Sequence, residues 1–420
     1  MTNYVIIGNS AAAVGAVEGI RRIDASGPIT LLSKEPHGVY SRPLISYLLK
    51  GKTTREKMRY RPERFYADHS VDARLGVEAV KILTDQSAVL TEDGKTVPYD
   101  KLLVATGSRP FLPPMPGIET VTRHFSFMTL DDASALDNAL SKDARVLIVG
   151  AGLIGLKCAE GIRARCASVD VADLSDRILS SILDEAGANL VQAHIEKHGV
   201  VFHLSASVTR FDGDTAVLSN GETLPFDILV TAVGVRPNTE LVSEAGGRVE
   251  RGIWVDEHMA TTLPNVYAAG DCVLSEDVSS VFGRRILALL PNAYIGGETA
   301  GICMAGGEAR YDHAIASNAI SFWGLSVMTA GSYTGEIRFS DRKGYKKLFC
   351  SADRLKGFII IGDIDKAGIY TALIRNQTPL SSIDFDLVFD EPSLMAFTRE
   401  SRAASINAAF LHTPAGTADR

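Results

Sequence analysis

Three glycines in the middle of the chain have the spacing of a loop that holds a dinucleotide pyrophosphate. They lie in "LIVGAGLIGLKCAEGIRA" (147–164), which has the pattern of an apolar strand, a tight turn and an amphipathic helix. In such a loop the first glycine permits the turn, the second lets the backbone approach phosphate, and the third lets helix and strand pack closely. The helix N-terminus adds N–H donors and a positive dipole end. The predicted contacts are Gly150, Gly152, Leu153, Ile154 and Gly155.

An acidic residue ends the next predicted strand, "SVDVAD" (168–173). A carboxylate at Asp173 can accept a hydrogen bond from a ribose 2′-hydroxyl and would repel a 2′-phosphate. The sequence therefore favours NADH over NADPH, although the neighbouring Arg177 makes this preference moderate.

The same pattern occurs at the N-terminus in a relaxed form. "VIIGNSAAAVGAVEGIRR" (5–22) aligns with the later segment without a gap, with Ser10 and Ala13 in place of its second and third glycines. Both side chains are small enough to leave the loop open. Two copies in register are much stronger evidence than one, so we predict two dinucleotide-binding domains. In this copy the next strand, "ITLLSKE" (29–35), offers Glu35 as the ribose-binding acid, with Lys34 close to the expected position.

A second internal repeat supports this division. "YDKLLVATGSRP" (99–110) matches "FDILVTAVGVRP" (226–237), with an acid, a glycine and an Arg-Pro pair at equivalent positions. Each copy is predicted to be a buried strand that closes its own nucleotide domain. The matched pairs are Asp100 with Asp227, Gly107 with Gly234, and Arg109 with Arg236.

Composition excludes several classes of protein. With 420 residues the chain is too long for one core, and 46% hydrophobic and 22% charged residues are ordinary for a globular protein. A net charge of −7 without a dense basic patch argues against nucleic acid. The five cysteines are odd in number and lack CxxC spacing, which predicts neither a dithiol centre nor a metal site. No export signal or membrane span is visible, so we expect a cytoplasmic protein.

At this point the chain resembles, over nearly its whole length, the two-dinucleotide-domain flavoproteins of the pyridine nucleotide-disulfide oxidoreductase superfamily. "TLPNVYAAGDC" (262–272) is similar to the segment that returns the chain to the FAD domain in that superfamily. The resemblance implies FAD on the first domain and NAD(H) on the second. It also implies that Asp271 binds the ribityl or pyrophosphate part of FAD.

The loop "YSRPLISYLLKG" (40–51) narrows the branch, because it has no cysteine where disulfide reductases of the superfamily carry a reactive one. It looks like the Arg-Pro-Leu loop of rubredoxin reductases, ferredoxin reductases and the flavin module of assimilatory nitrite reductases. The resemblance implies that Arg42 pairs with an FAD phosphate or stabilises the reduced flavin. It further implies that the helix beginning near Pro291 in 289–307 points its N-terminus at the flavin.

The motifs and the resemblance together give two sets of binding residues. For FAD they are Gly8, Ser10, Ala11, Ala12, Ala13, Glu35, Arg42, Pro43, Ala105, Thr106, Gly107, Arg109, Gly270, Asp271, Pro291, Asn292 and Ala293. For NAD they are Gly150, Gly152, Leu153, Ile154, Gly155, Asp173 and Gly234.

One residue departs from the superfamily pattern. Lys157 stands where a glutamate near the nicotinamide is usual. Either the nicotinamide contacts are rearranged, or hydride exchange with NAD is weakened, or Lys157 points to solvent. Cys158 and Cys272 are predicted to be small buried hydrophobic residues rather than redox groups.

The predicted fold class is α/β, with two Rossmann-like domains and a small C-terminal α+β domain. The expected segments are 1–118 (FAD), 119–244 (NAD), 245–312 (FAD again) and 313–420 (interface). In the last segment we expect strands in 319–331 and 345–363, a hairpin turn at "SADR" (351–354) and a helix over 366–378. The tail 401–420 is a docking or frayed extension.

The predicted function is an FAD-dependent NADH:acceptor oxidoreductase. Without a redox thiol, the flavin itself takes the hydride and exchanges single electrons with an iron–sulfur or similar partner. This suggests the flavoprotein subunit of a complex, such as a tungsten-containing aldehyde oxidoreductase, in a homodimer or hetero-oligomer. The alternatives are a free-standing NADH oxidase or reductase and a flavin-bound structural or regulatory subunit.

Overall fold

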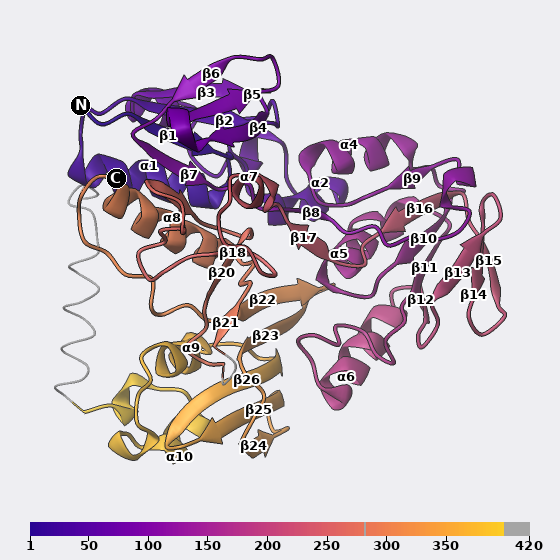
Figure 1. Ribbon diagram of the computed structural model, residues 1–420. Coiled ribbons are helices and arrows are strands. Elements are labelled where there is room, and N and C mark those ends of the chain that lie inside the picture. The colour runs from indigo at the N-terminus through magenta and orange to yellow at the C-terminus, as the bar shows by residue number, and fades with distance from the viewer. Residues whose placement is uncertain (281–282, 399–420) are drawn as a thin grey trace. The chain divides into compact units, whose positions relative to one another are not determined.

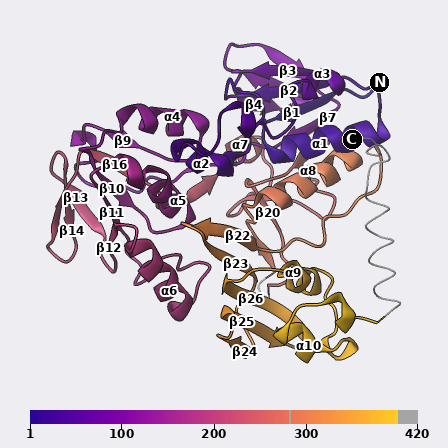
Figure 2. The same cartoon turned by 180° about the vertical axis from the view of Figure 1, so that it is seen from behind.

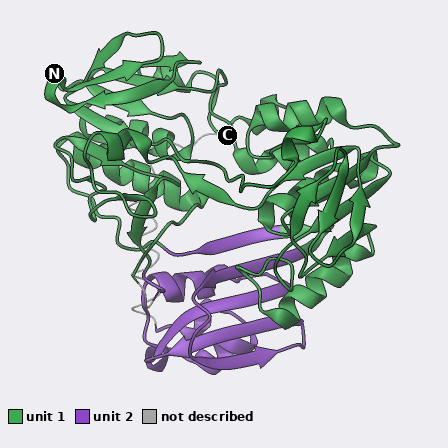
Figure 3. Cartoon of the chain, turned by 45° about the vertical axis from the view of Figure 1, so that its right-hand side comes forward, with its two compact units in different colours: residues 1–277, 283–314, 321–325 green, residues 278–282, 315–320, 326–420 purple. Residues whose placement is uncertain are grey.

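The computed structural model describes residues 1–280 and 283–398, and these form two compact units (Figure 3). The first unit contains residues 1–277, 283–314 and 321–325, and the second contains the other described residues. The predicted tail 401–420 lies outside the described residues. In the described part of the chain, no helix has both the length and the apolar character needed to span a bilayer.

A five-stranded parallel sheet is the centre of the N-terminal part of the first unit (Figure 1), with the order β19-β7-β1-β2-β3. Its central strands are continuous apolar runs, the pattern of strands buried on both faces. The strands are β1 (Tyr4–Ile7), β2 (Ile29–Ser33), β3 (Val71–Leu75), β7 (Lys101–Val104) and β19 (Val266–Ala268).

A second five-stranded parallel sheet repeats this arrangement with the order β12-β11-β10-β16-β9. The strands are β9 (His124–Phe125), β10 (Arg145–Val149), β11 (Ser168–Ala172), β12 (Val200–His203) and β16 (Ile228–Thr231). The two aspartates that match in the sequence repeat make equivalent hydrogen bonds in the two sheets. Asp100 accepts a hydrogen bond from the Asn3 N–H at 2.7 Å, and Asp227 accepts one from the Arg145 N–H at 2.8 Å.

Three smaller sheets and a two-stranded ribbon complete the first unit. The ribbon joins the two "RP" segments of the sequence repeat to each other, because β8 (Ser108–Pro110) pairs antiparallel with β17 (Val235–Pro237). The small sheets contain β4 (Ala79–Leu83), β5 (Ala88–Thr91) and β6 (Thr96–Pro98); β13 (Val208–Phe211), β14 (Thr215–Leu218) and β15 (Thr223–Pro225); and β18 (Ile253–Trp254), β20 (Val273–Glu276) and β21 (Arg284–Arg285).

Helices α1 (Ala11–Ile23) and α8 (Leu290–Met304) lie side by side in both views (Figures 1 and 2). Glycines on both helices permit this approach. A Cβ on Gly297 would lie 1.9 Å from the Ala12 carbonyl oxygen, and one on Gly15 would lie 2.2 Å from the Tyr294 carbonyl oxygen. Backbone therefore packs directly on backbone. The other helices of the unit are α2 (Ile45–Leu49), α3 (Phe65–Asp68), α4 (Leu130–Ala139), α5 (Leu153–Ile162), α6 (Glu185–Glu196) and α7 (Glu240–Glu244).

The second unit is built on a sheet with the order β22-β23-β26-β25-β24. Tyr370, Leu373 and Ile374 of α9 pack against its buried core. The predicted hairpin turn is confirmed, because Ala352 and Asp353 between β25 and β26 both have positive φ. The elements are β22 (Ser317–Phe322), β23 (Leu325–Gly331), β24 (Glu336–Ser340), β25 (Gly344–Ser351), β26 (Arg354–Gly362), α9 (Gly368–Arg375) and α10 (Phe385–Asp390).

Helix α9 is shorter than the predicted 366–378. Lys366 and Gln377 have φ values of 62° and 48°, so the backbone is left-handed just outside both ends of the helix. Such residues cannot continue a right-handed helix.

The close packing of α1 on α8 predicts that Gly297→Ala is strongly destabilising. The new methyl group would overlap backbone that cannot move without separating the helices, at a cost of about 3 kcal/mol in the free energy of unfolding. Gly368→Ala is the matched control, because no other heavy atom of the described chain lies within 4 Å of its Cβ, apart from its near neighbours. Thermal and denaturant unfolding would compare the two variants, and equal stability would contradict the packing argument.

Candidate functional site

The first glycines of the two loops have the same backbone conformation. Gly8 and Gly150 have φ values of 115° and 117°, which L side chains rarely adopt. A Cβ on Gly8 would also lie 2.1 Å from the Ala105 carbonyl oxygen, and one on Gly150 would lie 2.3 Å from that of Ala232. Each glycine thus lies against the segment that follows the closing strand of its sheet. This explains why both turns use glycine.

Each loop ends at the N-terminus of a helix. Ser10 precedes α1 and Gly152 precedes α5, both with extended backbone. In the described part of the chain the Ser10 hydroxyl makes no capping hydrogen bond. Backbone N–H groups at such helix ends suit a phosphate. Both loops therefore present the kind of backbone donors that a phosphate requires.

The second and third glycines of the later loop differ in their surroundings. Apart from its chain neighbours, no heavy atom of the described residues lies within 4 Å of a Cβ placed on Gly152. A Cβ on Gly155 would lie 2.0 Å from the Gly150 carbonyl oxygen. Gly152 therefore leaves room for a ligand, while Gly155 is needed for the packing of α5 on its own loop.

Asp173 directly follows β11 and turns back to the glycine loop. Its carboxylate accepts hydrogen bonds from the Ala151 N–H at 2.6 Å and the Ser175 N–H at 2.7 Å. The acid predicted from the sequence is thus held beside the loop by two backbone donors.

Around the first loop, three chain segments converge. A Cβ on Gly270, whose φ is 86°, would lie 3.2 Å from the Cβ of Ala12 and 3.8 Å from that of Ala293. The start of α1, the start of α8 and the segment after β19 therefore meet at positions that carry only small side chains. Pro291 lies in the first turn of α8, and Asn292 beside it is buried.

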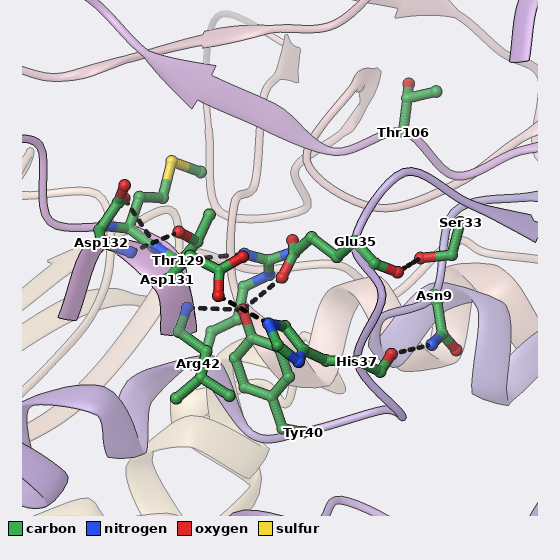
Figure 4. A network of polar contacts seen from close by, with 12 residues as sticks. Asn9, Ser33, Glu35, His37, Tyr40, Arg42, Thr106, Thr129, Asp131 and Asp132 are labelled. Carbon is green, nitrogen blue, oxygen red and sulfur yellow. Dashed lines mark hydrogen bonds and ion pairs between the residues drawn. The ribbon is translucent and has the colours of Figure 1, made fainter. Parts of the chain in front are cut away.

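Figure 4 shows a network of polar contacts around Glu35, Tyr40 and Arg42. The Arg42 guanidinium contacts the Glu35 carboxylate, and the Tyr40 hydroxyl donates to the same carboxylate at 2.7 Å. The Tyr40 hydroxyl also accepts a hydrogen bond from the Leu130 N–H at 3.0 Å. Lys34 points elsewhere and pairs with Glu78, so Glu35 is the acid that this loop turns inward.

Burial and charge act in opposite directions on this network. Burial lowers the pKa of Arg42, but Tyr40, Glu35 and Asp271 outweigh it and raise that pKa. Burial raises the pKa of Asp271, and Arg42 offsets part of this effect. Arg42 is therefore held in its charged form by its contact with Glu35 and by the charge of Asp271.

Sequence reasoning missed the outer members of the network. His37 contacts Asp131 at 2.7 Å, and its carbonyl oxygen accepts a hydrogen bond from Asn9 at 3.1 Å (Figure 4). Tyr66 donates to Asn9 at 2.9 Å. The only sequence signal for these residues was that Asn9 and Tyr40 lie inside the segments 5–22 and 40–51, which we singled out for other residues.

The closing strands place their predicted residues differently. The Thr106 hydroxyl donates a hydrogen bond to the Asn238 carbonyl oxygen, and the Asn238 side-chain amide donates one to the Thr106 carbonyl oxygen. The Gly107 carbonyl oxygen accepts a hydrogen bond from the Asn238 N–H. Arg109 is half exposed and pairs with Asn238 at 2.8 Å and Glu240 at 2.6 Å. The structure therefore gives Arg109 partners within the protein, and Pro43 is exposed.

Lys157 does not point to solvent, so that reading of the sequence is wrong. Its side chain is 19% exposed and its ammonium contacts the Glu160 carboxylate, with the Ser321 carbonyl oxygen 3.2 Å away. The ammonium also lies 4.7 Å from the centre of the Tyr47 ring. Contacts within its own helix and with two distant segments hold it in place.

The two cysteines near the loops are buried, as predicted. Burial raises the pKa of the Cys272 thiol to about 11 and raises that of Cys158 further. A thiol with a raised pKa forms little of the thiolate that disulfide chemistry needs.

Comparison with known proteins agrees with this geometry. The model of the pyridine nucleotide-disulphide oxidoreductase family matches residues 2–297. The chain belongs to this family. It is an FAD-dependent NAD(H) oxidoreductase with two Rossmann-like domains, which confirms the predicted superfamily, fold class and cofactors. The small side chains around Gly270 and the open space at Gly152 fit the two dinucleotides.

Two relatives and one solved structure show how far the likeness extends. The chain is 33% identical to the NADH-dependent phenylglyoxylate dehydrogenase subunit epsilon of Aromatoleum evansii, covering 91% of this chain and 93% of that one. It is 32% identical to the assimilatory nitrate reductase electron transfer subunit of Bacillus subtilis (strain 168), covering 89% of this chain but 49% of that protein. The covalent putidaredoxin reductase–putidaredoxin complex matches with a TM-score of 0.85 at 24% identity, covering 97% and 99% of the two chains, which supports the fold.

The Arg42 network predicts that Arg42→Met weakens FAD retention at least tenfold and lowers stability by about 2 kcal/mol, because it leaves Glu35 and Asp271 without their shared cation. Arg74→Met, which breaks an exposed pair with Asp72, is the control and should have little effect. The FAD that remains bound after gel filtration measures the first effect. Equal retention in both variants would show that Arg42 is not needed for FAD.

Proposed function

We propose that the chain transfers electrons between NAD(H) and an iron–sulfur or similar redox partner, as the flavoprotein subunit of a larger complex. The observation that carries this proposal is the loop 40–51. Tyr40 and Arg42 of this segment contact Glu35, and the segment 40–51 contains no cysteine. A thiol relay beside the flavin is therefore not available from this loop, and electrons leave the flavin directly.

In this proposal each predicted set of binding residues has a task. Gly150, Gly152 and the start of α5 hold the NAD pyrophosphate, and Asp173 receives the adenosine ribose. The first loop and α1 hold the FAD pyrophosphate, while Arg42 and Asp271 fix the charge beside it. Bound FAD supplies hydride acceptance and single-electron exchange, and the protein supplies orientation and exclusion of water.

The named relatives support the subunit role, since one is a subunit of a dehydrogenase and another is an electron transfer subunit. A tungsten-containing aldehyde oxidoreductase remains our specific proposal for the complex. The domain boundaries, a homodimeric or hetero-oligomeric state and a cytoplasmic location also remain predictions. A free-standing NADH oxidase or reductase is the alternative, because the missing cysteine does not count against reduction of oxygen to peroxide.

The proposal is tested by anaerobic titration of the purified protein with NADH while the visible absorbance of the flavin is followed. We expect bleaching at about one equivalent of NADH per flavin, with NADPH slower. The bleached protein should then reduce a small iron–sulfur protein faster than it reduces oxygen. Rapid oxygen consumption would contradict the electron-transfer role, and a flavin that stays oxidised would favour the structural or regulatory role.

The NAD site itself is tested by two glycine variants. Gly152→Ala should fold normally and keep FAD, yet weaken NADH binding at least tenfold, because its methyl group enters the space left for phosphate. Gly150→Ala should instead destabilise the fold by about 2 kcal/mol or more, since its φ and the Ala232 carbonyl oxygen both exclude a side chain. If Gly152→Ala binds NADH normally, the pyrophosphate lies elsewhere.

A further inference from the structure

The buried carboxylate of Glu160 forms ion pairs with two lysines. Glu160 of α5 is 8% exposed, and it contacts the ammonium groups of Lys157 and, at 2.7 Å, of Lys50. It also accepts a hydrogen bond from the Trp323 N–H at 2.9 Å. Burial raises the pKa of Glu160, but these partners more than offset it and lower that pKa. The carboxylate is therefore ionised.

The position of Lys157 relates it to both glycine-loop regions. It lies in α5 shortly after Gly155, the last glycine of the second loop. Its ammonium lies over Tyr47 of α2, the helix that directly follows Arg42, Pro43 and Leu44. Lys157 thus places a cation between the helix that begins at the NAD loop and the segment that carries the FAD-side arginine.

The charges of this cluster do not cancel. Two lysines face one glutamate, which leaves one positive charge in excess. The Lys157 side chain is mostly buried, so water and salt screen its charge weakly. The ammonium of the second lysine, Lys50, also lies 5.7 Å from the centre of the Trp323 ring.

From this arrangement, and on the basis of the function proposed above, we propose that Lys157 supplies a fixed positive charge that favours the reduced flavin. A hydride carries two electrons and one proton from NADH to FAD. The transfer adds one negative charge to the flavin and leaves one positive charge on the nicotinamide. A cation held near the flavin lowers the energy of the product anion.

A purely structural role makes a different prediction. If Lys157 only neutralises Glu160, then Lys157→Gln and Glu160→Gln would both lower stability without moving the flavin equilibrium in opposite directions. If the charge acts on the flavin, the two variants have opposite effects. Lys157→Gln removes a positive charge, whereas Glu160→Gln removes a negative one and increases the excess.

The experiment is an anaerobic reduction of the purified protein in the presence of a reference redox dye, without NADH or partner. The ratio of reduced to oxidised FAD is measured at a fixed ratio of reduced to oxidised dye. We expect Lys157→Gln to lower this ratio about tenfold, Glu160→Gln to raise it, and Lys157→Arg to leave it close to that of the wild type. Lys142→Gln, an exposed lysine at the opposite end of β10 from the glycine loop, controls for net charge.

The proposal is overturned if Lys157→Gln gives the same ratio as Lys142→Gln, or if Glu160→Gln lowers the ratio. Should Glu160→Gln fail to fold, the comparison of Lys157→Gln with Lys157→Arg decides alone. Because neither NADH nor a partner is present, failure here is distinct from failure of the proposed function. In that second case the wild-type flavin would respond to the dye but not to NADH.

Discussion

The first unit depends on the approach of backbone to backbone at a few glycine positions. A phosphate can meet the N–H groups of a helix only if no side chain stands between them. At Gly8 and Gly150 the turn lies directly against the segment after the closing strand, and at Gly297 one helix lies on the backbone of another. These contacts bring the starts of α1 and α8 together with Gly270. The geometry of the candidate site therefore depends on glycines, because a Cβ atom at these positions would prevent the close backbone contacts.

The charged residues near the site are organised by pairing. Removing a charge from water is costly unless a partner with good geometry replaces the water. Glu35 has Arg42 and Tyr40, while Glu160 has two lysines and a backbone N–H. Glu160 joins segments that are distant in sequence, whereas the partners of Glu35 lie within seven residues of it. Pairing therefore determines where fixed charge remains: the charges of Glu35 and Arg42 balance, whereas the cluster at Glu160 keeps one positive charge in excess.

Local sequence patterns predicted part of the fold and part of the candidate site. The loops, Asp173, the helix start at Pro291 and the turn at 351–354 follow from residue types at short spacing, and the structure has each in place. The partner of Arg109 and the contacts of Lys157 with Ser321 and Tyr47 were not predictable, because they come from distant segments whose approach no periodicity encodes. The end of α9 was misjudged because its flanking residues are left-handed despite ordinary side chains.

The two loops also show why one copy tolerates side chains that the other excludes. A Cβ at Gly155 would overlap the Gly150 carbonyl oxygen, yet the equivalent Ala13 is fully buried without such a clash. The backbone around this position therefore differs between the two loops, because the first loop accommodates a Cβ there. Gly270 and the start of α8 approach the first loop at Ala12, so the surroundings of this loop come from segments that are distant in the chain as well as from its own backbone.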